Sequence, residues 1–134
     1  MRKILMIVAM LAASAGVGAL TGATPASAAD YGCGAGEVCL FSDASYETTG
    51  CKSDWVGNNN DYRAWGYEYT SSACYYKALN NSVSSIKNRG NSYSTRHYKD
   101  AFWAGDYRTL ARGASWSTLV TGLKDALSSH QWIA

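Results

Sequence analysis

The stretch LNNSVSSIKN (residues 79–88) decides the fold, because the stretch LKDALSSHQW (residues 123–132) repeats its pattern. Each begins with Leu, continues with polar residues, and then has an aliphatic residue followed by a Ser pair. A pattern that recurs within one chain indicates a supersecondary unit used twice. A chain rich in Ser can produce one such match by chance, so a second point of agreement is required.

The second agreement lies upstream of each Ser pair. FSDASYET (residues 41–48) and YKDAFWAG (residues 98–105) both open on an aromatic residue and carry Asp-Ala at the third and fourth positions. In both, another aromatic residue follows five positions after the first. Because the two features occur in the same order each time, we predict two units, at about residues 37–89 and 94–133.

Short strand signals, bounded by Gly, Asn, Asp or Ser, run through both units and predict an all-β domain. The abundance of Tyr, Trp, Gly and Ser favours the same fold class. No segment has a long amphipathic helical period, although residues 117–127 could form a helical turn. The expected strands cover residues 38–41, 75–79, 83–87, 94–98, 107–110 and 127–132.

Residues 1–28 have the organisation of a secretory signal peptide. Two basic residues precede an uncharged run at residues 4–20, and an A-x-A pattern at residues 26–28 provides a cleavage site. A transmembrane helix would need about 20 strongly apolar residues, and Gly and Ser dilute this run. We therefore predict a secreted protein that keeps no membrane anchor after cleavage and consists of one domain at residues 29–134.

The net charge of the chain depends on that leader. The whole sequence has 12 Lys and Arg against 10 Asp and Glu, but Arg2 and Lys3 lie in the leader and every acidic residue follows it. The mature chain is therefore formally neutral, and it has no Lys/Arg cluster. These features argue against nucleic acid and anionic membranes as partners. About 105 mature residues are enough for one domain with one core, and we expect a monomer.

An even set of four cysteines in an exported chain predicts disulfides. Three pairings are open, and we favour Cys33–Cys39 with Cys51–Cys74, because CGAGEVC is a Gly-rich turn that can close tightly. A zinc site built from all four cysteines is the alternative. Their separations do not match the short C-x-x-C type of spacing that such sites use, which argues against zinc.

The first unit is longer than the second by about thirteen residues. The excess lies in VGNNNDYRAWGYEYTSSAC (residues 56–74), which the second disulfide would restrain. An extra loop of this kind can be a binding loop or a surface decoration. If WGYEY forms a strand, Trp65, Tyr67 and Tyr69 share one face, and exposed aromatic side chains are favoured anchors at interfaces. The same face could instead belong to the core.

Four residues of the second unit carry a longer pattern. Tyr98 is followed by a second aromatic residue five positions later (Trp103), by Gly105 two positions beyond that, and later by Ser128. This pattern resembles the Greek-key signature of the βγ-crystallin superfamily. The resemblance implies a β-sandwich of two Greek keys, in which the Gly adopts a positive φ in a folded hairpin.

The first unit fits the same signature with one departure. Phe41, Tyr46 and Ser84 occupy the matching positions, but Thr48 stands where the Gly is expected. A β-branched residue is unfavourable at positive φ. We therefore expect a looser first hairpin, or one that turns through residues 49–50.

The layout of leader, CGAGEVCLF, two units and NNSVSSIKN resembles one branch more closely still. It is similar to the small secreted bacterial proteins grouped as family 36 peptidase inhibitors, whose named member inhibits metalloproteinases. The resemblance extends from Cys33 to Trp132. It implies an inhibitor of an extracellular protease, of metalloproteinase type, that presents a rigid surface loop and requires no cofactor. The alternative is a non-inhibitory βγ-crystallin module that binds calcium or cell-surface polysaccharide.

Asn80, Asn81, Ser84 and Ser85 also match the superfamily's calcium motif, Asn/Asp-Asn/Asp-x-x-Ser/Thr-Ser. Calcium takes oxygen ligands, which amides, hydroxyls and turn carbonyls provide. The resemblance implies that the two copies of the motif lie side by side and exchange their hydroxyl ligands. Ser84 and Ser128 would then each serve the neighbouring site.

The second copy of the motif is incomplete. Lys124 stands where an oxygen-bearing residue belongs, and Asp125 is the one charged ligand of the set. Since affinity falls with the number of charged ligands, we expect weak calcium binding. The other interpretation is that these side chains only bond the turn backbone. The implied ligands are Asn80, Asn81, Ser84, Asp125 and Ser128.

Catalytic motifs are lacking in the sequence. His97 and His130 are the two side chains suited to act as bases at neutral pH, and neither adjoins a recognisable nucleophile motif. His130 follows the Ser pair in an expected strand, where successive side chains point to opposite faces. Asp43 and Asp100 occupy equivalent repeat positions, which indicates shared turn chemistry. We therefore expect a protein that is not an enzyme.

Overall fold

The computed structural model describes residues 32–46, 50–68, 72–74 and 76–134. The predicted leader, Thr48 and Tyr69 lie outside these ranges. The strands are β1 (Val38–Phe41), β2 (Lys52–Trp55), β3 (Ser85–Asn88), β4 (Ser94–Asp100), β5 (Ala104–Leu110), β6 (Ser115–Trp116) and β7 (Ser129–Ile133). Four short 3-10 helices connect them: η1 (Ala44–Tyr46), η2 (Tyr62–Ala64), η3 (Ser72–Cys74) and η4 (Ala101–Trp103).

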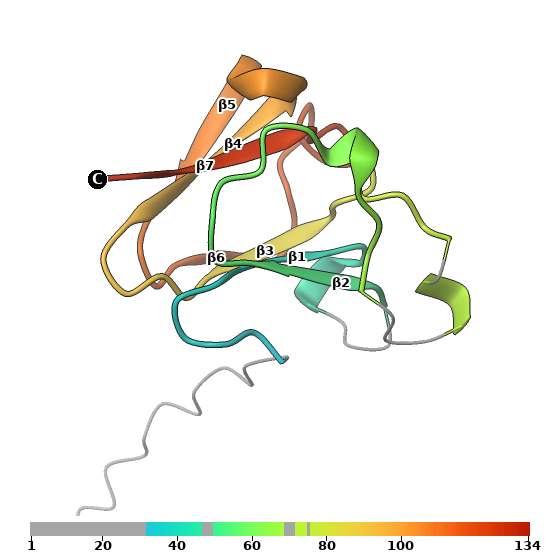
Figure 1. The fold of residues 1–134 in the computed structure, drawn as a ribbon, viewed down its shortest axis with the longest axis horizontal. Helices are drawn as coiled ribbons and strands as arrows, with labels where there is room; N and C mark the ends of the chain where they lie inside the picture. Colours follow the sequence, from blue (N-terminus) through green and yellow to red (C-terminus); the bar gives the residue numbers. More distant parts are fainter. Residues whose placement is uncertain (1–31, 47–49, 69–71, 75) are drawn as a thin grey trace, which may run out of the picture.

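The strands form two antiparallel sheets that lie as separate layers (Figure 1). One sheet has the order β2-β1-β3-β6 and the other has the order β5-β4-β7. Strand β6 belongs to the second half of the chain, yet it pairs with β3 in the sheet built by the first half. A strand that crosses to the partner sheet is the mark of a Greek key. The all-β prediction with two Greek keys in a sandwich is therefore confirmed.

Most of the expected strands coincide with observed ones, namely β1, β3, β4, β5 and β7. The strand expected at residues 75–79 is wrong, because the described residues there form a turn in which Ala78 makes an isolated bridge with Gly66. Strand β2 was not expected, since KSDW has no apolar alternation. The turn at residues 121–126 fits the helical turn expected near there.

Both halves of the chain contribute to one core between the sheets. It holds aliphatic side chains from the strands and from the Leu-rich segments before each Ser pair, together with two buried tyrosines. Its members are Val38, Leu40, Cys51, Tyr62, Tyr67, Cys74, Leu79, Val83, Ile86, Leu110, Leu119, Leu123 and Leu127. Because a small sandwich has few long aliphatic residues, part of its aromatic content serves the core.

A tight corner follows the first strand of each half, and it has the same backbone in both. Ser45 and Tyr46 have φ of 58° and 59°, while Phe102 and Trp103 have φ of 60° and 61°. Two successive left-handed residues that are not Gly are rare. Their recurrence at matching positions supports the structural equivalence of the two sequence repeats.

The second Ser of each Ser pair fastens this corner. In the first half, the Ser85 hydroxyl donates to the Asp43 carbonyl (2.6 Å) and accepts from the Tyr46 N–H (3.1 Å). Ser85 is fully buried, so these two bonds satisfy both the hydroxyl and the strained backbone.

Ser129 makes the same two bonds in the second half, to the Asp100 carbonyl (2.7 Å) and from the Trp103 N–H (3.2 Å). Asp43 and Asp100 thus share a role in the turn, through their backbone carbonyls. The signature matches Ser84 and Ser128, but the corner is held by the Ser that follows each of them.

Gly105 lies directly after the second corner and has a φ of 73°, as the resemblance implied. A Cβ atom at this position would lie 2.2 Å from Oδ2 of Asp100. The position therefore requires Gly both for its backbone conformation and for space.

Candidate functional site

Two disulfides are present, Cys33–Cys39 and Cys51–Cys74, which is the pairing we favoured. Neither leaves a free thiol among the residues that the structure describes. The second bridge joins the start of β2 to η3 and encloses the predicted loop. Its Cα atoms lie 5.3 Å apart, and both cysteines are buried.

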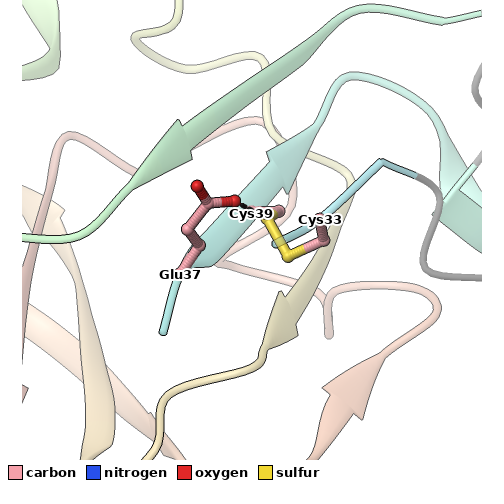
Figure 2. Close-up of side chains that lie close together, drawn as sticks. All are labelled: Cys33, Glu37 and Cys39. Carbon is pink, nitrogen blue, oxygen red and sulfur yellow. Dashed lines mark hydrogen bonds between the residues drawn. A yellow bond between two sulfur atoms is a disulfide. The ribbon is translucent and has the colours of Figure 1, made fainter. Parts of the chain in front are cut away.

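The first disulfide lies against the Glu37 side chain, as Figure 2 shows. One carboxylate oxygen of Glu37 lies 3.9 Å from Sγ of Cys39 and accepts a hydrogen bond from the Gly34 N–H (2.6 Å). A disulfide sulfur carries no proton to donate and no thiolate charge for a metal ion. This cluster is therefore a turn that the disulfide closes and that the Glu37 carboxylate stabilises through its hydrogen bond from Gly34, and not a metal site.

Backbone hydrogen bonds to β7 fix the first part of the loop. Asn59 and His130 exchange N–H···O bonds of 3.1 and 2.8 Å, and the Tyr62 N–H donates to the Ser128 carbonyl (2.8 Å). In Figure 1 this segment, which leads into η2, runs beside β7. The loop therefore covers the edge strand β7 of the second sheet through an isolated bridge.

Trp65 is displayed on this fixed backbone. Its N–H donates to the Tyr62 carbonyl (3.1 Å) and its carbonyl accepts from the Leu79 N–H (3.0 Å). The indole packs edge-on against the Trp55 ring, with centroids 4.9 Å apart, and remains 51% exposed. An aromatic side chain that is exposed on a rigid backbone loses little entropy when a partner covers it.

Tyr67 has a different role from the predicted one. It is only 6% exposed, and its hydroxyl accepts from Ser82 (3.0 Å). Burial raises the pKa of its phenol well above the ordinary value. The residues after Ala64 make only isolated bridges and form no strand, so Trp65 and Tyr67 need not share a face. Tyr67 is a core residue, and Tyr69 lies outside the described residues.

Two charged side chains precede Trp65 in the sequence and stabilise η2. The Asp61 carboxylate caps the helix by accepting from the Arg63 N–H (3.0 Å), and it pairs with the Arg63 guanidinium (2.7 Å). This guanidinium lowers the pKa of Asp61. It also lies over the exposed Phe102 ring, 5.6 Å from its centroid. The exposed surface around η2 therefore combines Trp65, Phe102 and one ion pair.

The two copies of the calcium motif lie side by side, as the resemblance implied. The Ser84 hydroxyl donates to Oδ1 of Asp125 (3.1 Å), and the Ser128 hydroxyl donates to Oδ1 of Asn81 (3.4 Å). Asn81 and Asp125 have matching positive φ of 56° and 53°. Each Ser therefore contacts the acidic or amide side chain of the other copy.

Asn80 provides the strongest sign that the first copy fits a cation. Its Oδ1 is buried and has no hydrogen-bond partner among the described residues. A buried acceptor without a donor is costly, and a hard cation would satisfy it. Lys124 is exposed, so its ammonium group can turn toward solvent.

The two histidines lie in the interior, away from solvent. His97 and His130 are fully buried, directly opposite each other on β4 and β7, with ring centroids 5.9 Å apart. Burial lowers the pKa of His130 to about 4 and that of His97 well below its ordinary value. Both rings are therefore neutral at physiological pH, and neither is exposed to a substrate.

The fold and the paired motifs define a βγ-crystallin-type domain, and solved structures agree. The chain resembles a structure described as "Evolution of the eye lens beta-gamma-crystallin domain fold", with 28% identity, a TM-score of 0.61, and coverage of 77% of this chain and 91% of the other. A βγ-crystallin from Ciona intestinalis gives 23% identity, a TM-score of 0.56, and coverage of 73% and 100%. A βγ-crystallin from an archaeon gives 21% identity, a TM-score of 0.51, and coverage of 75% of this chain and 100% of the other.

Within that class, the model of peptidase inhibitor family I36 matches residues 26–110, which is more than half of the chain. The chain belongs to this family. Membership of an inhibitor family and a crystallin-like fold point to a non-enzymatic protein, and the family suggests a protease as its partner. No curated protein sequence is significantly similar to it.

The two disulfides are consistent with an extracellular protein. Among the described residues, no helix has the length and apolar character needed to span a bilayer.

Proposed function

We propose that the protein is secreted and inhibits a metalloproteinase by presenting the segment at residues 56–68 to the enzyme. Family membership supports the inhibitor role. The observation that favours this segment is the exposed Trp65 on a backbone that is hydrogen-bonded on both sides. The nearby disulfide Cys51–Cys74 and the bonds to β7 keep the segment in one conformation.

Rigidity matters because a flexible loop would lose conformational entropy on binding. Trp65 also has the chemistry of an interface anchor, since Trp is enriched among the residues whose truncation weakens binding most. The Asp61–Arg63 pair beside it is exposed, and exposed charges at the rim of an interface affect orientation more than affinity. Trp65 is therefore the residue to test first.

Trp65→Ala should weaken inhibition by about 30-fold, because truncation of an interface anchor costs about 2 kcal/mol or more. Inhibition constants against a panel of metalloproteinases and serine proteinases measure this effect. Tyr107→Ala is the matched control, since Tyr107 is another aromatic residue that is 51% exposed and it lies on β5, at the opposite edge of the second sheet from β7. Equal inhibition by the Trp65→Ala variant and the unsubstituted protein would remove the loop mechanism, and no inhibition of either protease class would remove the proposed function.

A second candidate function is calcium binding by a non-inhibitory module, or recognition of cell-surface polysaccharide by the same scaffold. The unpartnered Asn80 oxygen and the crossed contacts of Ser84 and Ser128 favour the calcium form. With Asp125 as its one charged ligand, the site should bind only at about 10⁻⁴ to 10⁻³ M, in the range of weak extracellular modules.

Lys124→Asp should strengthen calcium binding by about tenfold, because it replaces a repelling cation with an oxygen ligand. Calorimetric titration of both proteins measures the change. Arg112→Asp alters the net charge equally in a turn near Asn91, so it controls for general electrostatic attraction. The same gain in the control, or the absence of heat at millimolar calcium in every protein, would contradict the calcium hypothesis.

A further inference from the structure

The edge strand β5 carries a charged side chain on the face that a sandwich normally fills with apolar residues. His97 points into the core, where its ring lies 5.7 Å from that of Trp116. Arg108 is the direct cross-strand partner of His97, and directly opposed residues share a face of the sheet. Arg108 is therefore on the inner face of β5. Asp106 lies where the β4–β5 pairing has a register shift, and it lines the same hollow as Arg108.

A hollow opens between this face and the turn that follows β6. It has a volume of about 450 Å³ and lies between Lys99, the first part of β5, and residues 120–123. A second hollow of about 270 Å³ adjoins it and is walled by Trp116, Leu119, Val120 and Leu123. Arg108, Val120 and Leu123 line both hollows, so the two form one groove with a charged outer part and an apolar inner part.

The charged groups of the groove have no partners among the residues that the structure describes. Lys99, Asp106 and Arg108 make no ion pair among the described residues, whose ion pairs are Lys52–Asp54 and Arg63–Asp61. Their side chains also donate or accept no hydrogen bond there. Two cations and one anion that border an apolar hollow without partners are groups to which a ligand can bond.

We propose that this groove binds the C-terminal residue of a peptide that ends in a large apolar side chain. The terminal carboxylate would pair with Arg108 and Lys99, since a guanidinium can hold a carboxylate through two hydrogen bonds. The N–H of the same residue would donate to Asp106. The side chain would enter the hollow beside Trp116, Leu119 and Leu123. This site is separate from the Trp65 loop and does not depend on inhibition.

The composition of the groove selects this chemistry over others. An excess of cations at the outer part disfavours a metal ion and favours a carboxylate. The single carboxylate of Asp106 adds a site for a donor, which a simple fatty acid lacks. The inner hollow has room for one large side chain and offers it four apolar walls.

The test is titration of the isotope-labelled protein with acetyl-Ala-Ala-Phe, observed through backbone amide shifts. We expect saturable shifts at residues 105–108 and 120–123, and binding at least about tenfold weaker for the same peptide with a C-terminal amide, which removes the charge-assisted pair. Octanoate should bind more weakly than the peptide acid, because it has no N–H for Asp106.

Arg108→Gln should weaken peptide binding by about fivefold to tenfold, and Val120→Asp should weaken it similarly by placing a like charge in the groove. Both residues are exposed, so the fold should remain intact, which the amide spectrum verifies. Arg112→Gln removes one cation outside the groove and should leave binding unchanged. Equal binding of acid and amide, tighter binding of octanoate, or shifts confined to other residues would overturn the proposal.

Discussion

Acidifying the protein from about pH 7.5 to about pH 5 should lower its free energy of unfolding by about 2 kcal/mol from His130 alone. The folded-state pKa of His130 is about 4, against an ordinary value of 6.5. Between about pH 6.5 and pH 4, His130 therefore binds a proton in the unfolded chain but not in the folded chain. Stability falls as the pH drops below about 6.5 and stops falling once His130 protonates in the fold, near pH 4. His97, whose pKa is also lowered, acts in the same direction.

The surroundings of the two rings explain why the fold keeps them neutral. The His130 Nε2–H donates to the Gly57 carbonyl (2.9 Å), so its Nδ1 accepts from the Tyr62 hydroxyl (2.7 Å). His97 contacts the Thr95 hydroxyl through Nε2 (2.9 Å), and its Nδ1 has no partner among the described residues. Among the described residues, no carboxylate makes a hydrogen bond to either imidazole ring. Protonation would bury an unpaired charge, which costs several kcal/mol.

The sequence repeat suggests a variant that isolates the contribution of the two histidines to the pH dependence of stability. Leu40 and Ile86 form the equivalent cross-strand pair in the first sheet, where both are fully buried. The paired variant His97→Leu with His130→Ile therefore rebuilds in one sheet what the other sheet already contains. Its unfolding free energy, measured in urea at each pH, should lose more than half of the pH dependence between about pH 7.5 and pH 5.

The paired variant removes the hydrogen-bond partner of the Tyr62 hydroxyl. The single variant His97→Leu keeps that hydrogen bond, so it should be measured as a second variant. It removes a ring with one unsatisfied nitrogen and keeps the His130 bonds. Asp54 has a raised pKa because of burial and acts in the opposite direction at acid pH. Since both variants retain Asp54, the difference between their curves and that of the unsubstituted protein reports the histidines. A curve of unchanged slope in both variants would show that carboxylates cause the acid sensitivity.

The fold followed from sequence because its signals are local and repeated. The aromatic corners and the Ser pairs recur in the same order, and each corresponds to a rare backbone that few sequences adopt. The favoured disulfide pairing was correct for a similar reason, since a Gly-rich turn brings Cys33 and Cys39 together. Gly105 was predictable because one conformation and one steric contact both require it.

The remaining features depend on contacts between distant segments, which no local pattern reveals. Tyr67 and Trp65 are two residues apart, yet one is buried and the other exposed, because the bridges at Gly66 and Glu68 do not form a regular strand. The inner face of β5 could not be anticipated either. A charged residue such as Arg108 is typical of an exposed strand face, and only the pairing of Arg108 with His97 shows that this face turns inward.

Removal of the Cys51–Cys74 bridge should lower the free energy of unfolding by about 3.5 kcal/mol, since the bridge joins residues 23 positions apart and restricts the unfolded chain. Ser at these buried positions adds a desolvation cost. For a domain of this size the loss corresponds to a melting temperature lower by about 15–25 °C. Denaturant unfolding of the paired variant Cys51→Ser with Cys74→Ser measures the free energy.

The same variant separates the stability of the loop from its proposed action. Cys33→Ser with Cys39→Ser is the control, because that bridge spans 6 positions and should cost less, about 2.4 kcal/mol. It also lies in the turn before β1, away from Trp65. The proposed mechanism requires a rigid loop in the protease. Opening Cys51–Cys74 should then weaken inhibition at least about tenfold, whereas opening Cys33–Cys39 should leave inhibition unchanged. Both variants are compared at a temperature where both are folded. Equal loss in the two variants would mean that inhibition follows global stability, and the loop would then no longer be the proposed inhibitory element.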